Sequence, residues 1–154
     1  MPRPHPAHTE LERALTRLAR RVLLPTTGEA TRRRAGVHLE RATYATLVRI
    51  AELGDARLSE IAAALGLDAS TTSRHIRRLV DAGYVTVTAD PQDARARRHT
   101  ATAAGHEALA RVRDARLERL AEVLEGWDTD EVAGIAAGLD RLLDAFDADD
   151  RRQR

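Results

Sequence analysis

Residues 58–88 carry two short helical patterns followed at once by a strand pattern, and this order constrains the fold more than any other feature. The first apolar set lies at helical spacing and ends at Gly66; its members are Leu58, Ile61, Ala62 and Leu65. Ser59 is a plausible N-cap of this helix, and Asp68 or Ser70 of the next, which runs to about Ala82 before Gly83. The sequence therefore predicts two helices joined by a tight turn.

From Tyr84 onward the side-chain pattern changes from helical spacing to the two-residue alternation of a strand. YVTVT at 84–88 alternates β-branched and other residues, DPQDARA supplies turn residues, and RRHTAT forms a weaker second strand pattern. These residues predict a β-hairpin with an Arg-rich tip. Two helices with a hairpin directly behind them constitute a winged helix-turn-helix, a fold that binds DNA.

The rest of the chain reads as helices around this unit. Apolar spacing predicts helices at 9–24, where Pro25 stops the first, at 39–53, at 104–126 and from 130 onward, whereas PTTGEATRRRAG reads as a connection or frayed helix. The expected fold is mainly α with a small β-hairpin wing and with N- and C-terminal dimerisation helices. The expected organisation is a flexible tail (1–8), a dimerisation helix and connection (9–38), a DNA-binding domain (39–103), linking and dimerising helices (104–149) and a basic tail (150–154).

The near-neutral charge conceals a segregated distribution. The 154 residues carry a formal charge of +1, and every one of the 25 cations is Arg, since the chain has no Lys. Residues 70–100 hold six Arg against three Asp, whereas residues 101–150 have a net charge of −8. A polyanion could therefore bind the basic middle of the chain while the acidic C-terminal third faces elsewhere.

Several functional classes are disfavoured. The absence of Cys excludes disulfides, thiolate metal sites and thiol-based redox switching, and the six His residues lack the i, i+4 spacing of a preorganised zinc site. Phosphate-binding Gly loops and nucleophile motifs are missing, so we expect neither an enzyme nor a cofactor. No apolar run approaches the ~20 residues of a membrane span. MPRPHPAH lacks the apolar stretch of a signal peptide, and we expect a cytoplasmic protein.

The second helix of the pair has two contrasting faces. At ~100° per residue, Thr72, Ile76 and Leu79 share one side, and the opposite side presents Ser70, Thr71, Arg74, Arg77 and Arg78. Such a face can enter a major groove, where Arg donates two hydrogen bonds to guanine, but an ordinary solvated helix face would look the same. The hairpin favours DNA, because Arg95, Arg97 and Arg98 can reach a narrow minor groove from its tip.

The stretches LSEIAAALGLDASTTSRHIRRLVDAGYV and DPQDARARRHTATAAG resemble the MarR (multiple antibiotic resistance regulator) family of winged-helix repressors. Its Asp-x-Arg wing pattern is matched by Asp93 and Arg95, and its Thr-x-x-Gly by Thr102 and Gly105. The resemblance implies a homodimer that reads successive major grooves of a palindrome. By position it implies Arg95 as the minor-groove residue, oriented by Asp93, and as recognition-helix readers Ser70, Thr71, Ser73, Arg74 and Arg77.

Two departures from the family pattern concern the wing and its support. Thr72 and Ala101 stand where larger apolar residues are usual, and Arg98 and His99 stand where the returning strand is often apolar. We expect a less tightly packed wing, with Arg98 adding a phosphate contact. The resemblance also implies a small-molecule effector pocket near His38, Tyr44, Leu47 and Val112.

We therefore expect a homodimeric repressor that binds double-stranded DNA at a palindromic operator and that a small-molecule effector releases. Two other functions stay open. One is a winged-helix protein-interaction module, and the other is an architectural DNA binder without sequence preference.

Overall fold

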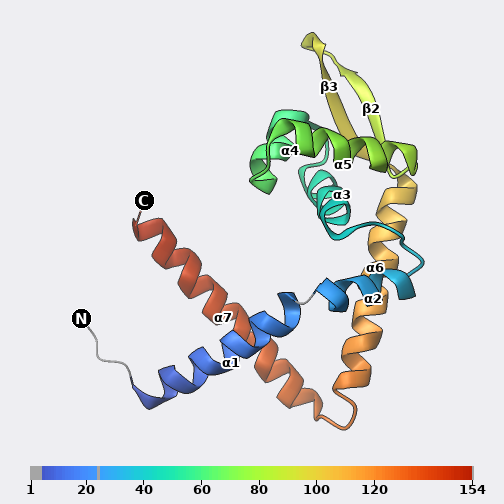
Figure 1. The fold of residues 1–154 in the computed structure, drawn as a ribbon. Helices are drawn as coiled ribbons and strands as arrows, with labels where there is room; N and C mark the ends of the chain where they lie inside the picture. The colour runs from blue at the N-terminus through green and yellow to red at the C-terminus, as the bar shows by residue number, and fades with distance from the viewer. Residues whose placement is uncertain (1–4, 24, 154) are drawn as a thin grey trace. The chain divides into compact units, whose positions relative to one another are not determined.

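The computed structural model describes residues 5–23 and 25–153, which fall into two compact units, and the boundary between the units in the sequence lies between Leu117 and Glu118. The elements are α1 (Pro6–Leu23), α2 (Pro25–Arg34), α3 (Arg41–Leu53), β1 (Ala56–Arg57), α4 (Leu58–Leu65), α5 (Ala69–Asp81), β2 (Val85–Asp90), β3 (Asp93–Ala101), α6 (Ala103–Val123) and α7 (Thr129–Gln153) (Figure 1). The expected fold, mainly α with a small hairpin wing, is confirmed.

Three segments differ from expectation. Residues 25–34 form a regular helix, α2, although their Thr, Gly and Arg residues offer almost no apolar periodicity. α1 already begins at Pro6, inside the expected N-terminal tail, and α7 continues to Gln153, into the expected C-terminal tail. Residues 1–4 and 154 of those two tails lie outside the described residues.

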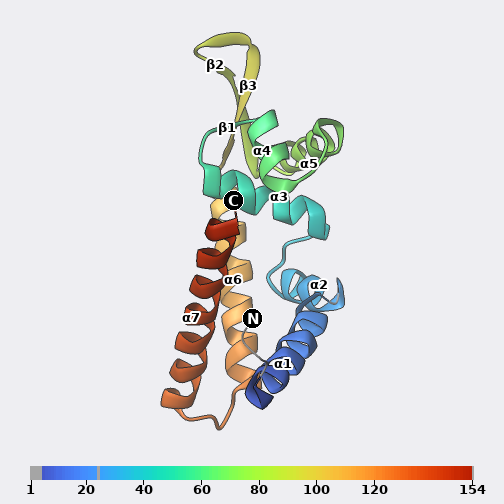
Figure 2. The same cartoon turned by 90° about the vertical axis from the view of Figure 1, so that its left-hand side faces the viewer.

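The core of the first unit lies among α3, α4, α5 and the sheet (Figure 2). Leu47 and Ile50 of α3, Ile61 of α4 and Leu79 of α5 are completely buried there. Thr72 and Ile76 are buried on the same side of α5 as Leu79, so the predicted inner face of this helix is confirmed. Burying these apolar side chains fixes α5 on the scaffold and leaves its opposite face to solvent.

The turn between α4 and α5 is set by its two ends. Gly66 ends α4 in the left-handed conformation, with φ of 63°, and Asp68 caps α5. The prediction of Ser59 as the N-cap of α4 was wrong. The helix begins at Leu58, and the carboxylate of Glu60 accepts a hydrogen bond from the backbone N–H of Arg57 at 2.6 Å.

The wing is a three-stranded antiparallel sheet in the order β1-β3-β2. The predicted hairpin of β2 and β3 is present, with Val85 opposite Ala101 and Ala89 opposite Arg97. The two-residue strand β1 pairs with the other edge of β3, and the sequence did not predict it. β1 ties the base of the wing to the start of α4, because Arg57 ends β1 and directly precedes Leu58.

Candidate nucleic-acid interface

The N-terminus of α5 is closed by Asp68. Its carboxylate accepts hydrogen bonds from the hydroxyl of Ser70 at 2.6 Å and from the backbone N–H of Thr71 at 2.8 Å. These two hydrogen bonds, the one from Ser70 first, hold the pKa of Asp68 well below its usual range. The cap therefore stays ionised at neutral pH and fixes the first turn of the helix.

The outward face of α5 carries the predicted readers. Arg74 and Arg77 are exposed, Ser70 is exposed, and Thr71 and Ser73 are half-buried. The Arg74 guanidinium donates from Nη2 to the Thr71 hydroxyl at 3.0 Å, which restrains its rotamers. The structure thus brings Ser70, Thr71, Arg74 and Arg77 onto one exposed helix face with a net positive charge.

Arg78 and His75 belong to α5 but contact α3 and the residue before it. Arg78 forms an ion pair with Glu40, which directly precedes α3, and both side chains are more than half exposed. The Nδ1 atom of His75 lies 3.0 Å from the hydroxyl of Thr43 in α3. Glu40 and Thr43 are 38 and 32 residues away from their partners Arg78 and His75 in sequence, so helix periodicity gave no signal for either contact.

The tip of the wing holds Arg95 and Arg97 exposed to solvent. The Asp93 carboxylate accepts a hydrogen bond from the backbone N–H of Arg95 at 3.0 Å, and so it shapes the turn that carries this Arg. The contact concerns the backbone of Arg95, not its guanidinium. Arg95 is therefore presented from an ordered turn with its side chain free to reach a neighbouring surface.

Arg98 lies at the base of the wing rather than at its tip. Its Nε donates to Asp90 at 2.9 Å, and its Nη1 donates to the carbonyl of Asp55 at 3.0 Å. Asp90 also accepts from Nε of Arg57 at 2.7 Å. Arg98 is thus occupied within the protein, although the sequence suggested it as a phosphate contact.

Asp90 connects Arg57 and Arg98 at the base of the wing, because its carboxylate pairs with both. Its side chain has no exposed surface, and it accepts a third hydrogen bond from the backbone N–H of Gln92 at 2.8 Å. The hydrogen bond from Arg57, followed by that from Gln92, holds the pKa of Asp90 well below its usual range. Sequence reasoning missed Asp90 and Arg57, because they are 33 residues apart and meet only when β1 joins the sheet.

The four residues suggested for an effector pocket occupy different surroundings. Leu47 is completely buried in the core of α3, α4 and α5, and Val112 is buried with Val37 and Ala108. Tyr44 lines a pocket of about 370 Å³ between α3 and α6, and exposed His38 lines another at the α2–α3 junction. Neither of these two pockets is lined by Leu47 or Val112.

Two features are absent from the described part of the chain, residues 5–23 and 25–153. No three His, Asp or Glu side chains there gather as metal ligands would. None of the helices there combines the length and the apolar character that crossing a membrane would require.

Comparison with known proteins gives one consistent result. Residues 39–96 match the MarR family. YxaD, an HTH-type transcriptional regulator of Bacillus subtilis (strain 168), is 35% identical over 109 residues, which cover 71% of this chain and 76% of YxaD. Transcriptional regulator Tm0710 from Thermotoga maritima has a similar structure, with a TM-score of 0.72, 26% identity and coverage of 92% of this chain and 96% of that one. RV1404 from Mycobacterium tuberculosis shares the fold, with a TM-score of 0.78, 21% identity and coverage of 94% and 98%.

Proposed function

Because the chain belongs to the MarR family and is a winged-helix transcriptional regulator rather than an enzyme, we propose that it is a homodimeric repressor of a palindromic operator. In each protomer α5 enters a major groove and the wing tip follows the adjacent minor groove. Arg74 and Arg77 read base edges, Ser70, Thr71 and Ser73 contact phosphates or bases, and Arg95 and Arg97 enter the minor groove. Arg78 and Arg98 act mainly within the protein, because carboxylates already hold them.

One observation carries this proposal. The exposed guanidinium groups of α5 and those of the wing tip belong to one structural unit, and both elements are fixed on it by buried contacts. Two arginine-bearing elements held at a fixed separation can contact two neighbouring grooves of DNA. A helix face that is merely solvated would not require a second basic element on the wing.

Homodimerisation is supported by the apolar side chains that a single protomer leaves uncovered. None of the described residues of α7 is buried. Ten large apolar side chains on α1, on the second half of α6, just after α6 and on α7 are each at least 39% exposed. They are Leu11, Leu18, Leu117, Leu120, Val123, Trp127, Ile135, Leu139, Leu143 and Phe146. Exposed apolar surface of this extent marks an interaction site. A second copy of the chain is the occupant we propose, because dimers place two recognition helices on two half-sites.

The proposal includes release of the protein from DNA by a small-molecule effector. It also includes a cytoplasmic location, because the protein needs access to the chromosome. Two pockets within the first unit offer space for a ligand, of about 370 and 410 Å³. Both volumes lie within the usual range of small-molecule sites, about 300–1,000 Å³.

The decisive experiment is a DNase footprint of the protein on the DNA flanking its own gene, repeated with random-sequence competitor. We expect protection of a palindrome whose half-sites lie about one helical turn apart, roughly 10 base pairs. Uniform protection without a preferred site would instead indicate an architectural DNA binder. If the protein protects no DNA, even at concentrations at which other regulators saturate random DNA, the result would favour a protein-interaction module.

A further inference from the structure

His75 lies on the flank of α5 that contacts α3, beside the exposed face of the helix. Its Nδ1 atom is 3.0 Å from the hydroxyl of Thr43, which belongs to the first turn of α3. Thr43 is almost completely buried, with 1% of its surface exposed, whereas His75 is half-buried. The pair therefore joins a buried hydroxyl to a ring that borders the solvent.

The buried hydroxyl determines which ring nitrogen of His75 carries the hydrogen. Among the described residues, the Thr43 hydroxyl has no hydrogen-bond partner other than Nδ1 of His75. If Nδ1 carried a hydrogen, it would donate to Thr43, and the hydroxyl hydrogen would be left without an acceptor in a buried site, which is costly. The hydroxyl therefore donates to Nδ1, and the neutral ring carries its hydrogen on Nε2.

The other ring nitrogen, Nε2, is accessible to solvent. No described residue accepts a hydrogen bond from it, yet no fully enclosed side-chain nitrogen or oxygen of the described residues lacks a partner. Nε2 is therefore not sealed between α3 and α5. Because the hydrogen bond from Thr43 holds the ring at Nδ1, the N–H at Nε2 is presented to the surface in a defined direction.

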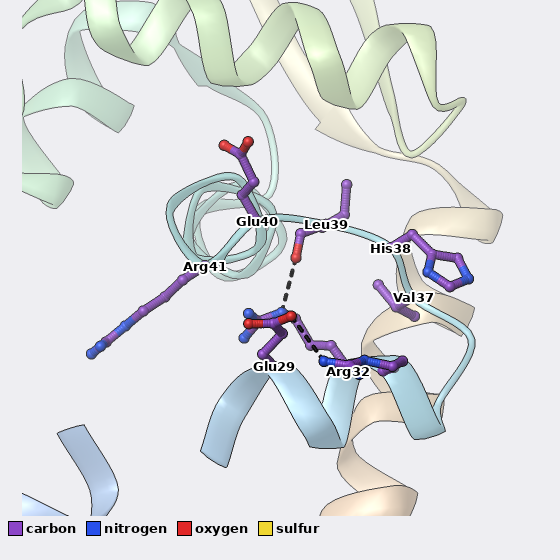
Figure 3. A pocket seen from close by; sticks show the side chains of 8 residues that line it. Glu29, Arg32, Val37, His38, Leu39, Glu40 and Arg41 are labelled. Carbon is purple, nitrogen blue, oxygen red and sulfur yellow. Dashed lines mark hydrogen bonds and ion pairs between the residues drawn. The ribbon is translucent and has the colours of Figure 1, made fainter. Parts of the chain in front are cut away.

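Charged side chains on either side of His75 already have partners. Arg78, one turn further along α5, forms an ion pair with Glu40, whose side chain is directed towards α5 in Figure 3. Arg74, the residue before His75, lies on the outward face and donates to the hydroxyl of Thr71. The Nε2–H of His75 is thus an uncharged donor between the outward face of α5 and the ion pair beside α3.

We propose that the Nε2–H of His75 donates a hydrogen bond to a DNA phosphate at the edge of the major groove, and that Thr43 is the positioning residue that holds this donor in place. Side chains on the flanks of a helix in a groove face the sugar–phosphate backbone, and phosphate contacts fix the register of the helix. The insertion of α5 into a groove rests on the proposed function. His75 differs in kind from the arginines, because it contributes a directed donor without a charge.

The Thr43–His75 pair is tested first in the DNA-free protein, by long-range proton–nitrogen NMR spectra at about pH 8, where an ordinary imidazole is neutral. We expect His75 to show one tautomer, with its hydrogen on Nε2. Thr43→Val removes the hydroxyl, and it should shift both ring nitrogen signals as the second tautomer becomes populated. Thr43→Ser should restore the original spectrum. Thr46→Val is the matched control, because Thr46 is also buried in α3 but donates to the backbone carbonyl of Ala42.

Two results of these spectra would overturn the pair. One is a hydrogen on Nδ1 of His75 in the unmodified protein. The other is a Thr43→Val protein whose His75 signals are the same as those of the unmodified protein.

The phosphate contact is tested by fluorescence anisotropy with operator and random duplexes. His75→Leu should weaken binding to both by about tenfold, as expected for a hydrogen bond to a charged group, because a phosphate contact carries no sequence information. The slope of affinity against salt should stay unchanged, since no charge is lost. His75→Gln should lose less, because its amide keeps an N–H donor. His106→Leu, at an exposed position near the start of α6, is the control.

The positioning role of Thr43 is tested by a double-mutant cycle. Thr43→Val should weaken DNA binding by about two- to fivefold. It should have no further effect in the His75→Leu background, because Thr43 acts only through the ring. A full effect of Thr43→Val in that background would refute the positioning role.

Unchanged affinity of His75→Leu for both duplexes would refute the phosphate contact, and so would a loss confined to the operator. If this variant does not fold, the Nε2–H signal of the unmodified protein decides, since it should shift and exchange more slowly with water when random duplex is added. An Nε2–H signal that does not respond to DNA would also refute the contact. Absence of DNA binding by the unmodified protein would refute the proposed function and the contact together, whereas the spectra of the free protein would still judge the pair.

Discussion

Gly105 of α6 lies so close to the backbone of Tyr84 that a methyl group on its Cα would be 2.3 Å from the Tyr84 carbonyl oxygen. The neighbouring Thr102 donates its hydroxyl to the Gly83 carbonyl at 2.7 Å and accepts from the Gly105 N–H at 3.1 Å. Thr102 therefore caps α6 and ties it to the chain entering the wing. The Thr-x-x-Gly pattern has a physical basis here. Thr102 forms the hydrogen bonds that connect α6 to the chain entering the wing, and Gly105 lacks the side chain that would clash with Tyr84.

Gly105→Ala should destabilise the fold by about 1–3 kcal/mol, the usual cost of forcing an extra methyl group into a packed site. The carbonyl it meets belongs to the backbone and cannot rotate away. Urea denaturation followed by far-UV circular dichroism measures the loss. Gly134→Ala in α7 is the control, because its added methyl meets nothing within 4 Å and alanine favours a helix. Equal stability of Gly105→Ala and the unmodified protein would show that α6 can shift away from Tyr84.

Arg74→Ala should reduce the preference for the operator over random DNA, by about 1–3 kcal/mol if the guanidinium binds a guanine edge. Arg74 is exposed and is restrained by Thr71, so its loss removes a positioned donor rather than a packing contact. Fluorescence anisotropy with operator and random duplexes at one salt concentration measures the effect, with Arg49→Ala on α3 as control. An equal loss on both duplexes would make Arg74 a phosphate anchor.

Arg95→Ala should weaken operator binding and reduce the magnitude of its salt slope by about 0.9, the value for one lost phosphate-neutralising charge. The expectation depends on the exposed position of Arg95 at the wing tip and on the turn that Asp93 holds. Affinities at several salt concentrations give the slope, and sedimentation gives the oligomeric state, which should not change. Arg113→Ala, on the exposed side of α6, controls for general loss of charge. Affinities that match those of the unmodified protein at every salt concentration would remove the wing from the interface.

The sequence predicted the DNA-binding unit well because local periodicity determines it. The inner face of α5 follows from spacings of three and four residues, and the hairpin follows from alternation in YVTVT. Asp68 could be named as a cap because capping depends on residues within one turn. Each of these features needs only near neighbours in the chain.

Contacts between distant residues could not be predicted in the same way. Arg98 carries a charge next to other wing arginines. The pairing of β1 with β3 brings Asp55 to it, whereas Asp90 reaches it within the hairpin of β2 and β3. Glu40 and Arg78 are 38 residues apart. The sequence left residues 25–36 open between a connection and a frayed helix, because α2 has no apolar face to detect. Hence the sequence predicted that Arg74, Arg77, Arg95 and Arg97 are exposed, but it did not predict the ion pairs of Arg78 and Arg98 within the protein.

Leu143→Asp should dissociate the proposed dimer without unfolding the protomer. Leu143 is 61% exposed in one chain, so its replacement removes no buried contact there but places a charge in an apolar interface. Light scattering after size exclusion should give the mass of a monomer, and operator affinity should fall because one protomer spans only one half-site. Leu53→Asp, at the exposed end of α3, should stay dimeric. A Leu143→Asp protein that keeps the dimer mass would exclude this face of α7 from the interface.

The buried carboxylate of Asp90 should make stability depend on pH. Its pKa is lowered in the folded protein, chiefly by the hydrogen bond from Arg57, so its contribution is fully present above the pKa of an unfolded Asp, about 3.9, and declines as pH falls below that value. Asp90→Asn should therefore lower the urea midpoint at pH 7, since Arg57 and Arg98 lose their shared anion, and the gap to the unmodified protein should narrow below about pH 4. Asp114→Asn, on the exposed side of α6, should show almost no gap at either pH. A gap for Asp90→Asn that stays constant from pH 7 to the acid limit of folding would mean that the charge of Asp90 does not hold the wing base together.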